Sequence, residues 1–481
     1  MALQQILEEI DNHHMEMVRF ELTDFYGISH CKEIPARHFL EKVENGVLIY
    51  GGLLAKDPQA ALVPGTGYYE EINFGDLEYH ADLSTFRTVP WVPETARVLI
   101  YPKYRGKLVN GYPRNVADRL LGVLKSEGYS LYSSHEHEFF VVDAVTKQPI
   151  TDDCKTTTSD GSRLRIVRDR NAPGQYEITY KPAFGLQAAD NAFTYKNGIK
   201  EIAQQHGYLA SFTTKPYADH VGASAHLNHS LWDEHGKRNL MFDASSPNGL
   251  SKIARHWIAG LLYHAPAITV LHSPTVNCIT RIREREFAPA NATWAVDNRS
   301  TAFRIKSNGT AGGTYVENRL GSSGGCPYTS VAATVAAGLD GIKNEYELPP
   351  PVSGNAYEED NLPPKTAKLP TDMESALEAL LADKVICNAM GDEFIKCFVA
   401  LKKYELVCEA AAMEKEWIMP NGREVIILIT SKLFQTISGS ACTRIVVFHQ
   451  ALLLIFTSIQ CCQSLTSTLT TKPIIRTYIR V

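Results

Sequence analysis

The stretch Ser134-His135-Glu136-His137-Glu138-Phe139-Phe140 places two carboxylates two residues apart within a run of aromatic and β-branched residues. This composition predicts a β-strand over residues 129–142. Because residues i and i+2 of a strand share one face, Glu136 and Glu138 are expected on one side and the two histidines on the other. Two carboxylates on a half-buried strand need a positive partner, and a hard divalent cation is one such partner.

Further candidate ligands and positive groups follow this strand along the chain. Three potential metal ligands and four arginines alternate in short motifs: Glu177, His226, Arg281, Arg299, Arg304, Glu317 and Arg319. Carboxylates with one imidazole suit Mg²⁺ or Mn²⁺, and arginines bind the planar oxygens of carboxylates and phosphates. Together these residues predict a site for metal, nucleotide phosphates and an acidic substrate.

Each of these residues alone also has an ordinary structural explanation. An acidic doublet is often a solvated strand face, a lone histidine is often a hydrogen-bonded core residue, and a single arginine often forms a surface salt bridge. His226, however, ends the glycine-containing segment 215–226, and four arginines lie in register with the acidic motifs. The set as a whole therefore favours the functional interpretation.

Composition restricts the class of protein. The chain has 481 residues, of which 44% are hydrophobic and 21% charged, enough for two or three domains with a sizeable core. A net charge of −5 provides no basic surface, so we expect no nucleic-acid partner. The N-terminus has no signal-peptide pattern, and the ten cysteines have no paired spacing outside Cys461-Cys462. These features predict a cytoplasmic protein with reduced thiols.

The hydrophobic pattern changes several times along the chain. Residues 17–98 predict a small strand-rich domain, and apolar residues at helical spacing predict a helix over 115–127. Strands and helices then alternate to about residue 345. A proline-rich surface connection, 348–370, precedes an amphipathic helical pair over 374–405 with a break near Met390-Gly391-Asp392.

The C-terminal end has a different composition. Residues 425–481 contain no acidic residue, and their apolar segment 445–456 is interrupted by His449 and Gln450. A membrane-spanning helix needs about 20 predominantly apolar residues. We therefore interpret this end as a tail outside any domain, with a C-terminal membrane anchor as the alternative.

The motifs, taken in order, resemble those of the type I glutamine synthetase family. Matching segments run from about residue 17 to about residue 418: 83–91 (LSTFRTVPW), 113–114 (PR), the Glu136/Glu138 strand, 173–177 (PGQYE), 215–231, 297–300 (DNRS) and 332–342 (AATVAAGLDGI). The resemblance implies an α+β fold with a small β-grasp N-terminal domain over 15–105. A large glutamine synthetase-type α/β catalytic domain on an antiparallel sheet would span 106–418, and 419–481 would be a tail outside the family.

The resemblance also implies ATP as co-substrate and two Mg²⁺ or Mn²⁺ ions. Matched by motif position, Glu138 and Glu177 would hold one ion, and Glu136, His226 and Glu317 the other. The nucleotide would contact a set drawn from the same motifs: Lys215, Gly222, His226, Asn228, Ser230 and Arg304. A third carboxylate for the first ion falls at Arg170, beside Asp169, and because a guanidinium repels a cation this predicts weak binding there.

Catalytic roles transfer in the same way. Arg281 would bind the substrate carboxylate, and Arg299, Arg304 and Arg319 would stabilise the transferring phosphoryl group. The ammonium-handling positions differ from the family pattern: Tyr50-Gly51-Gly52-Leu53 replaces an Asp-Gly-Ser-Ser latch, and Phe287, next to Glu286, replaces a flap acid. Without nearby carboxylates, ammonium is neither attracted nor deprotonated.

Three functions remain open on this basis. The first is an ATP-dependent ligase that activates the γ-carboxylate of glutamate as an acyl phosphate and joins it to ammonia, which is glutamine biosynthesis. The second uses the same activation with an organic amine, whose apolar part would pack on Tyr50, Leu53 and Phe287. The third is a non-catalytic structural or cytoskeleton-associated protein.

The third possibility comes from the lengsin subfamily, which is described as lacking enzymatic activity. The chain is most similar to that subfamily in segments 189–194, 231–233 and 399–406. Retention of five expected ligands favours an enzyme, because clustered unpaired acids destabilise a fold. The missing ammonium acids favour an organic amine, and the resemblance implies a ring homo-oligomer.

Overall fold

The structure is a computed structural model that describes the backbone of residues 2–150, 157–158, 164–168, 172–217, 220–282 and 287–418. Side chains are described over the same ranges except 157–158, 164–168 and 412–418. The helices in these ranges are too short or too polar to cross a lipid bilayer. The tail predicted over 419–481 lies outside the described residues.

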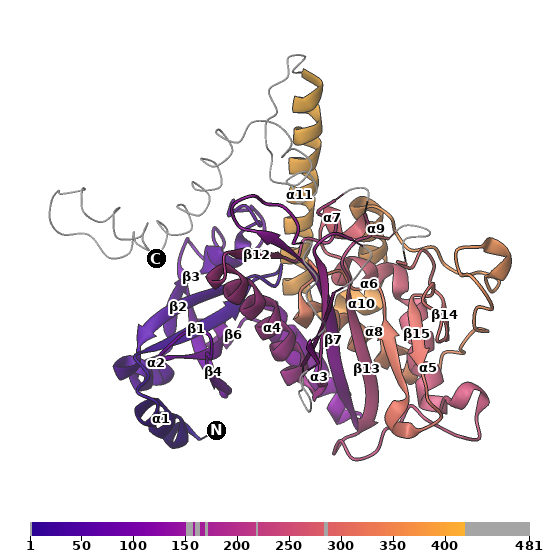
Figure 1. Ribbon diagram of the computed structural model, residues 1–481, viewed down its shortest axis with the longest axis horizontal. Coiled ribbons are helices and arrows are strands. Elements are labelled where there is room, and N and C mark those ends of the chain that lie inside the picture. Colours follow the sequence, from indigo (N-terminus) through magenta and orange to yellow (C-terminus); the bar gives the residue numbers. More distant parts are fainter. Residues whose placement is uncertain are drawn as a thin grey trace. The chain divides into compact units, whose positions relative to one another are not determined.

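The N-terminal residues form a mixed six-stranded sheet, as the strand-rich pattern predicts (Figure 1). Its strands are β1 (Met17–Thr23), β2 (Ser29–Pro35), β3 (Val47–Tyr50), β4 (Asp76–Thr88), β5 (Thr95–Tyr104) and β6 (Lys107–Leu108), in the order β2-β1-β5-β4-β3, with β6 pairing with β5. The β1–β5 pair is parallel and the other pairs are antiparallel. Val18, Phe20 and Leu22 alternate into the core on one face of β1, and Glu21 and Thr23 are buried on its other face.

Short helices accompany this sheet: α1 (Leu3–Asn12), η1 (Ala36–His38), α2 (Phe39–Asn45) and η2 (Gly51–Ala55). The helix α1 is amphipathic and buries Ile6 and Ile10. Phe39 of α2 contacts Phe20 of β1 and Phe86 of β4, with ring centroids 5.9 and 5.7 Å apart. Aromatic packing of this kind fixes α2 against the sheet.

The second sheet has ten strands and carries the predicted ligands. The strands are β7 (Tyr129–Asp143), β8 (Thr157–Thr158), β9 (Leu164–Arg168), β10 (Gln175–Tyr180), β11 (Ala183–Phe184), β12 (Tyr208–Ser211), β13 (Ala225–Asp233), β14 (Trp294–Val296), β15 (Phe303–Lys306) and β16 (Tyr315–Asn318). Their order is β14-β15-β16-β13-β7-β10-β9-β8, and β11 and β12 also pair with β7. Apart from the parallel β14–β15 pair, the sheet is antiparallel, which confirms the α+β fold.

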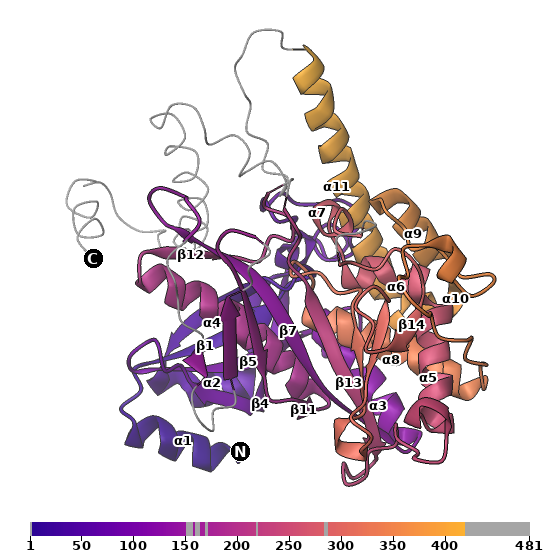
Figure 2. The same cartoon turned by 45° about the vertical axis from the view of Figure 1, so that its right-hand side comes forward.

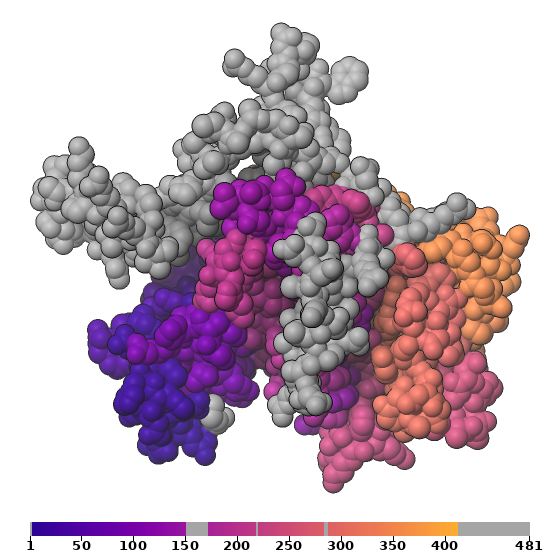
Figure 3. All heavy atoms as spheres, viewed as in Figure 1, coloured from indigo at the N-terminus to yellow at the C-terminus, as the bar shows by residue number. Residues whose placement is uncertain are grey.

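Helices cover this sheet and join it to the N-terminal domain. They are α3 (Pro113–Ser126), α4 (Leu186–Gln205), η3 (Pro247–Gly249), α5 (Lys252–Tyr263), α6 (Ala265–His272), α7 (Val276–Ile279), η4 (Ala311–Gly313), α8 (Pro327–Lys343), η5 (Glu359–Asn361), α9 (Met373–Ala382), α10 (Lys384–Met390) and α11 (Asp392–Ile418). Two views place α4 between the N-terminal sheet and β7 (Figures 1 and 2). The space-filling view shows the indigo N-terminal residues and the orange residues near α9 on opposite sides of the same face (Figure 3).

The C-terminal helices differ from the prediction in number. The predicted break near residue 391 is confirmed, because Gly391 takes φ +91 and ends α10. A second break at Asp383 was missed, so the expected helical pair over 374–405 is wrong and three helices are present. Asp383 ends α9, and its side chain accepts a hydrogen bond from the Ile386 amide at the start of α10. Aspartate is a strong N-cap, which makes this break favourable.

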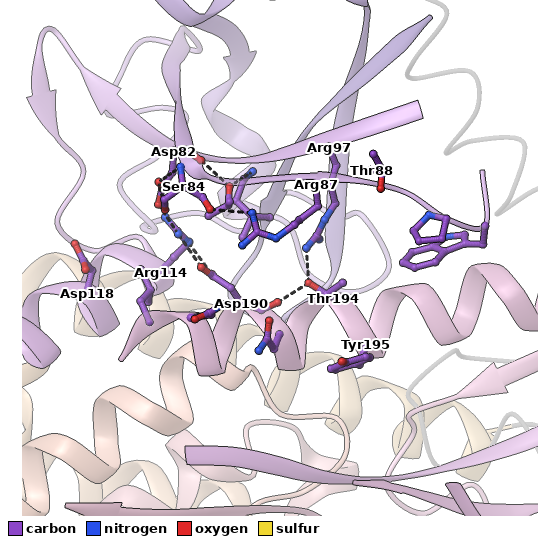
Figure 4. A pocket seen from close by; sticks show the side chains of 17 residues that line it. Asp82, Ser84, Arg87, Thr88, Arg97, Arg114, Asp118, Asp190, Thr194 and Tyr195 are labelled. Carbon is purple, nitrogen blue, oxygen red and sulfur yellow. Dashed lines mark hydrogen bonds and ion pairs between the residues drawn. The ribbon is translucent and has the colours of Figure 1, made fainter. Parts of the chain in front are cut away.

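A buried arginine joins the N-terminal sheet to the helices of the second domain. Arg114, near the start of α3, donates from Nε and Nη2 to Asp190 of α4, at 2.8 and 2.9 Å, and from Nη2 to Asp82 of β4 at 2.7 Å. Tyr328 of α8 donates to the same Asp190 carboxylate. This network borders a pocket between β4, α3 and α4 (Figure 4). Because forked arginine bonds are directional, the network fixes the angle between the N-terminal sheet and α4.

A second buried ion cluster holds the helical layer together. His264, between α5 and α6, has no exposed side-chain surface and lies 2.6 Å from Asp383 and 3.0 Å from Asp340 of α8. Burial alone would lower the pKa of His264, but the two carboxylates outweigh it and raise the pKa above its usual value. The protonated imidazole therefore joins the α5–α6 junction to α8 and to the start of α10.

We expect His264→Gln to lower the free energy of unfolding by about 3–5 kcal/mol at pH 6, because it leaves two carboxylates without their buried cation. Since the folded pKa of His264 is raised, its contribution is complete below about pH 6.5 and is lost as the pH rises through the folded pKa. The difference between wild type and variant should therefore shrink above pH 6.5, measured by urea unfolding from pH 6 to pH 9.

The matched control is His235→Gln, since the His235 side chain is 69% exposed. That variant should unfold like wild type throughout the range. A difference between wild type and His264→Gln that stayed constant from pH 6 to pH 9 would contradict a charged His264.

Candidate functional site

Strand register brings three predicted ligands together on one face of the large sheet. His226 on β13 lies opposite Glu136 on β7, and the β13–β16 pairing places Glu317 beside them. The Nδ1 atom of His226 is 3.6 Å from Oε1 of Glu136 and 3.5 Å from Oε1 of Glu317. These separations exceed an ordinary hydrogen bond, and Nδ1 is buried without a hydrogen-bond partner.

Both carboxylates of this cluster are ionised. Burial would raise the pKa of Glu136, but His226, a hydrogen bond of 3.3 Å from Asn228 Nδ2 and the charge of Arg319 together lower it. Burial likewise opposes a lowering of the pKa of Glu317 that comes from His226, Arg319 and Arg304. Nearby positive charge therefore keeps both carboxylates on this face of the sheet deprotonated.

The other predicted pair of carboxylates lies next to this cluster. Glu177 on β10 is directly opposite Glu138 on β7. One oxygen of Glu138 accepts a hydrogen bond of 2.6 Å from the Ser224 amide and a longer one, 3.4 Å, from Gln175 Nε2. Arg170 and Asp169, which bear on the proposed weakness of this ion site, lie outside the described residues.

The histidines of β7 occupy the opposite face, as their alternation predicts. His135 and His137 are each 1% exposed, and their rings stack with centroids 5.4 Å apart. Burial lowers the pKa of His135 to about 3 and that of His137 in the same direction. Neutral imidazoles on this face have no part in the acidic cluster.

Two of the predicted arginines bind the same carboxylate. Arg304 on β15 donates to Oε2 of Glu317 at 2.9 Å, and Arg319 donates to Oε1 of Glu317. Arg304 also donates to Asp297 at 2.8 Å, and Arg319 to the Phe287 carbonyl at 2.9 Å. The Nε atoms of both arginines are buried and have no hydrogen-bond partner. Both guanidiniums thus retain donors for a further acceptor.

The other two arginines have different surroundings. Arg281 is 3% exposed and donates to Ser322 Oγ and to the carbonyls of residues 319–321 at 2.9–3.2 Å. Burial lowers the pKa of Arg281 to about 10. These contacts brace the segment that follows β16, and substrate binding by Arg281 stays a prediction. Arg299 is exposed in the turn after β14.

The residues predicted to contact nucleotide lie close to this face. Gly222 is packed so tightly that a Cβ atom would lie 2.9 Å from Arg281 Cγ and 3.0 Å from Lys215 Cγ. Asn228 donates to Glu136, as described above, whereas the Ser230 hydroxyl accepts a hydrogen bond from the Trp232 indole at 2.9 Å. Asn228 therefore borders the acidic cluster, Gly222 lies between Arg281 and Lys215, and the Ser230 hydroxyl is already bonded within the chain.

Sequence reasoning missed several residues that orient the site. Asp297 holds Arg304, Gln175 and Ser224 hold Glu138, and the Tyr357 hydroxyl donates to the Ala288 carbonyl at 3.1 Å. All but Tyr357 lie inside motifs that mark the site. Only the three-dimensional structure shows which site residue each of them binds.

The positions expected to handle ammonium carry aromatic and apolar groups. Phe287 is 61% exposed and has φ +56, while Tyr50 is half-buried with its ring over Gly52. Leu53 packs partly against the N-terminal core. Glu286, the acid next to Phe287, lies outside the described residues.

The residues of the second predicted ion site are compatible with a divalent cation. Among the described residues, no three histidine, cysteine or acidic side chains already converge as a metal-binding group. Even so, His226 offers a buried nitrogen without a hydrogen-bond partner between two ionised carboxylates, and a nitrogen with two carboxylates suits Mg²⁺ or Mn²⁺. A cation here would compete with the arginines for Glu317.

Comparisons with known proteins agree with the geometry. The family described as the glutamine synthetase catalytic domain matches residues 150–418. Lengsin from Canis lupus familiaris is 34% identical over 443 residues, which cover 86% of this chain and 75% of lengsin. Glutamine synthetase from Thermotoga maritima is 31% identical over 87% of this chain and 96% of its own length.

Other relatives carry names that specify an organic amine or a nucleotide. A glutamate–isopropylamine ligase from a Pseudomonas species is 29% identical over 84% of this chain and 94% of its own length. A solved structure titled as a GmaS–ADP complex superposes with a TM-score of 0.72 at 23% identity, covering 86% of this chain and 97% of that one. At that identity the structural likeness supports the fold alone.

We predict that a divalent cation bound at this cluster stabilises the folded protein. Mn²⁺ should raise the melting temperature with the logarithm of its concentration above the Kd, since a ligand at about 100 times its Kd adds about 2.7 kcal/mol. Glu136→Gln removes one charged ligand and should reduce the shift, as read from a thermal melt titrated with Mn²⁺. Glu234→Gln is the control, because this acid is 53% exposed and follows the last strand residue of β13. Equal shifts in both variants and wild type would exclude the cluster as the metal site.

Proposed function

Because the chain belongs to the glutamine synthetase family, we propose that it is an ATP-dependent ligase that activates the γ-carboxylate of glutamate and joins the acyl group to an amine. One observation carries the proposal. Glu136, His226 and Glu317 lie together on one face of the sheet. Arg304 and Arg319 both bind the Glu317 carboxylate, and each retains an Nε–H group without a hydrogen-bond partner.

These residues suit phosphoryl transfer. Glu136, His226 and Glu317 would hold an ion that neutralises the nucleotide phosphates, and Glu138 with Glu177 would hold one near the substrate. Arg304 and Arg319 would turn part of their hydrogen bonding from Glu317 to the transferring phosphoryl group, which is stabilised mainly by positioned positive charge. Asp297 would keep Arg304 in place during this exchange, since it binds the guanidinium independently of Glu317.

We further propose that the preferred acceptor is an organic amine. Tyr50, Leu53 and Phe287 stand where acids and small polar residues are expected around ammonium, so the pocket would offer hydrocarbon contact and little negative charge. Burying apolar surface of the amine yields about 25 cal/mol per Å², whereas a bare ammonium ion loses hydration without a carboxylate to replace it. The glutamate–isopropylamine ligase among the relatives supports this choice.

A non-catalytic role is the second candidate, and one observation favours it. Glu317 is ion-paired with two arginines, so the charge of this carboxylate is neutralised without a metal ion. A scaffold that had lost catalysis would be stable in this state. The similarity to lengsin is compatible with that alternative.

An ADP-release assay with glutamate and a panel of amines distinguishes these functions. With Mg²⁺ or Mn²⁺ we expect poor ammonium-dependent release and faster release with methylamine, ethylamine or isopropylamine. Arg319→Gln should abolish release, because it removes charge from the phosphoryl position. Robust glutamine synthesis from ammonium by wild type would contradict the amine preference.

The double variant Tyr50→Asp with Phe287→Glu supplies the two missing acids and should restore ammonium use. Tyr50→Phe with Phe287→Leu is its matched control, because it adds no charge. If wild type and the acidic variant are both silent with every amine, and ATP with Mg²⁺ still raises the melting temperature, the non-catalytic candidate becomes the better account.

We also propose that the active protein is a ring homo-oligomer in which the N-terminal domain of one subunit closes the site of the next. In this arrangement Tyr50 would reach the amine pocket of a neighbouring subunit. Mass photometry at working concentration should show a multimer, and a monomer alone would contradict the proposal. Leu48, which is 59% exposed on β3 near Tyr50, gives a direct variant: Leu48→Asp should weaken assembly if β3 lies at the interface.

A further inference from the structure

Two lysines of α4 project toward one aromatic ring on the face of β7 away from the acidic cluster. Lys196 and Lys200 are one helical turn apart, and each Nζ lies 5.6 Å from the centroid of the Phe212 ring. His137 of β7 meets the same ring edge-on, at 6.1 Å. Two ammonium groups thus share one small, largely apolar environment.

The two lysines differ in their hydrogen bonding. Lys196 is 3% exposed, and its Nζ donates to the carbonyls of Ser323 and Gly325, both at 3.0 Å. Lys200 is half-buried and forms neither a hydrogen bond nor an ion pair with any part of the chain that the structure describes. Lys200 is therefore the less stabilised cation of the pair.

Neighbouring elements supply little negative charge to Lys200. Among the described residues, Asp24, in the turn between β1 and β2, is the acidic group that acts on it, but the Asp24 carboxylate accepts hydrogen bonds from the amides of Tyr26 and Ile28 at 2.8 and 2.9 Å. Its other oxygen lies 3.0 Å from His30 Nε2. The β7 histidines contribute no negative charge, since they are neutral.

Burial and the charge of Lys196 consequently favour the uncharged amine of Lys200. Burial has the larger effect and Lys196 adds to it, so that the pKa of Lys200 falls to about 7 despite the opposing effect of Asp24. Lysines become nucleophilic when an apolar surface or a second cation depresses ionisation.

We propose that Lys200 is a covalent modification site, a nucleophilic amine that is acylated by small acyl phosphates. The uncharged Nζ attacks the carbonyl carbon of the acyl phosphate and forms an amide bond. The bond between that carbon and the phosphate oxygen breaks, and inorganic phosphate leaves as hydrogen phosphate, which takes up the proton lost by the nitrogen. The product no longer carries a charge beside Lys196. This property is independent of the proposed ligase activity.

Acetyl phosphate with the full-length protein tests the proposal. We expect Lys200 to be acetylated about tenfold or more faster than Lys252 at pH 7.5, measured residue by residue by peptide mass spectrometry, because the fraction of uncharged amine is larger. Lys252 is an exposed comparison whose ion pair with Glu345, at 2.8 Å, raises its pKa. The ratio should fall as the pH approaches 10.

The variant Lys196→Met tests the cause. It removes the neighbouring cation and should slow acetylation of Lys200 at pH 7.5. Its melting temperature would show that it is folded. Equal rates at Lys200 and Lys252 at pH 7.5, a Lys200 rate that rises only near pH 10, or no labelling of Lys200 in the folded protein would each overturn the proposal.

Discussion

The acidic row on one face of the large sheet is the constraint on which the site depends. Glu136, Glu138, Glu177 and Glu317 come from three strands and lie within a few positions of one another in the register. Like charges on a partly buried surface repel, and each must be compensated by positive charge or hydrogen bonds. The strand order and the segments that flank the strands supply this compensation: β15 brings Arg304, the residue after β16 is Arg319, and the segment before β13 supplies the Ser224 amide.

The need to compensate these carboxylates is met in two ways, by the arginines of the protein itself or by a bound cation, so the fold is compatible with both an enzyme and a non-catalytic scaffold. Within the acidic row, Arg304 and Arg319 pair with Glu317 and compensate its charge. Binding of a cation and phosphates would release those arginines toward new oxygens, so the charge of the site would be rearranged with little net change. In this site, loss of catalysis would therefore not require loss of the fold.

Alternation along β7 was predictable from sequence, because period-two patterning depends on local chemistry alone. It correctly separated Glu136 and Glu138 from His135 and His137. Cross-strand partners were not predictable in this way: Glu317 lies 181 residues after Glu136 in the chain, and its place beside Asn228 depends on the pairing of β13 with β16. The backbone contacts of Arg281 could not be predicted for the same reason, because every residue has a backbone carbonyl and a sequence motif does not show which one is bound. The helix break at Asp383 did have a local signal, the N-cap preference of aspartate, which a purely periodic interpretation overlooked.

The two faces of β7 differ in charge, with ionised carboxylates on one face and neutral histidines on the other. On the acidic face, ionised carboxylates attract arginines and are suited to a cation, whereas on the other face buried imidazoles remain neutral and two lysines face an aromatic ring. A carboxylate in place of His137 would pair with those lysines and restore their charge. It would also place negative charge directly beneath the acidic row and raise the pKa values there. Neutral histidines avoid both effects, so they add no negative charge beneath the acidic face and, among the described residues, provide no counterion for Lys200.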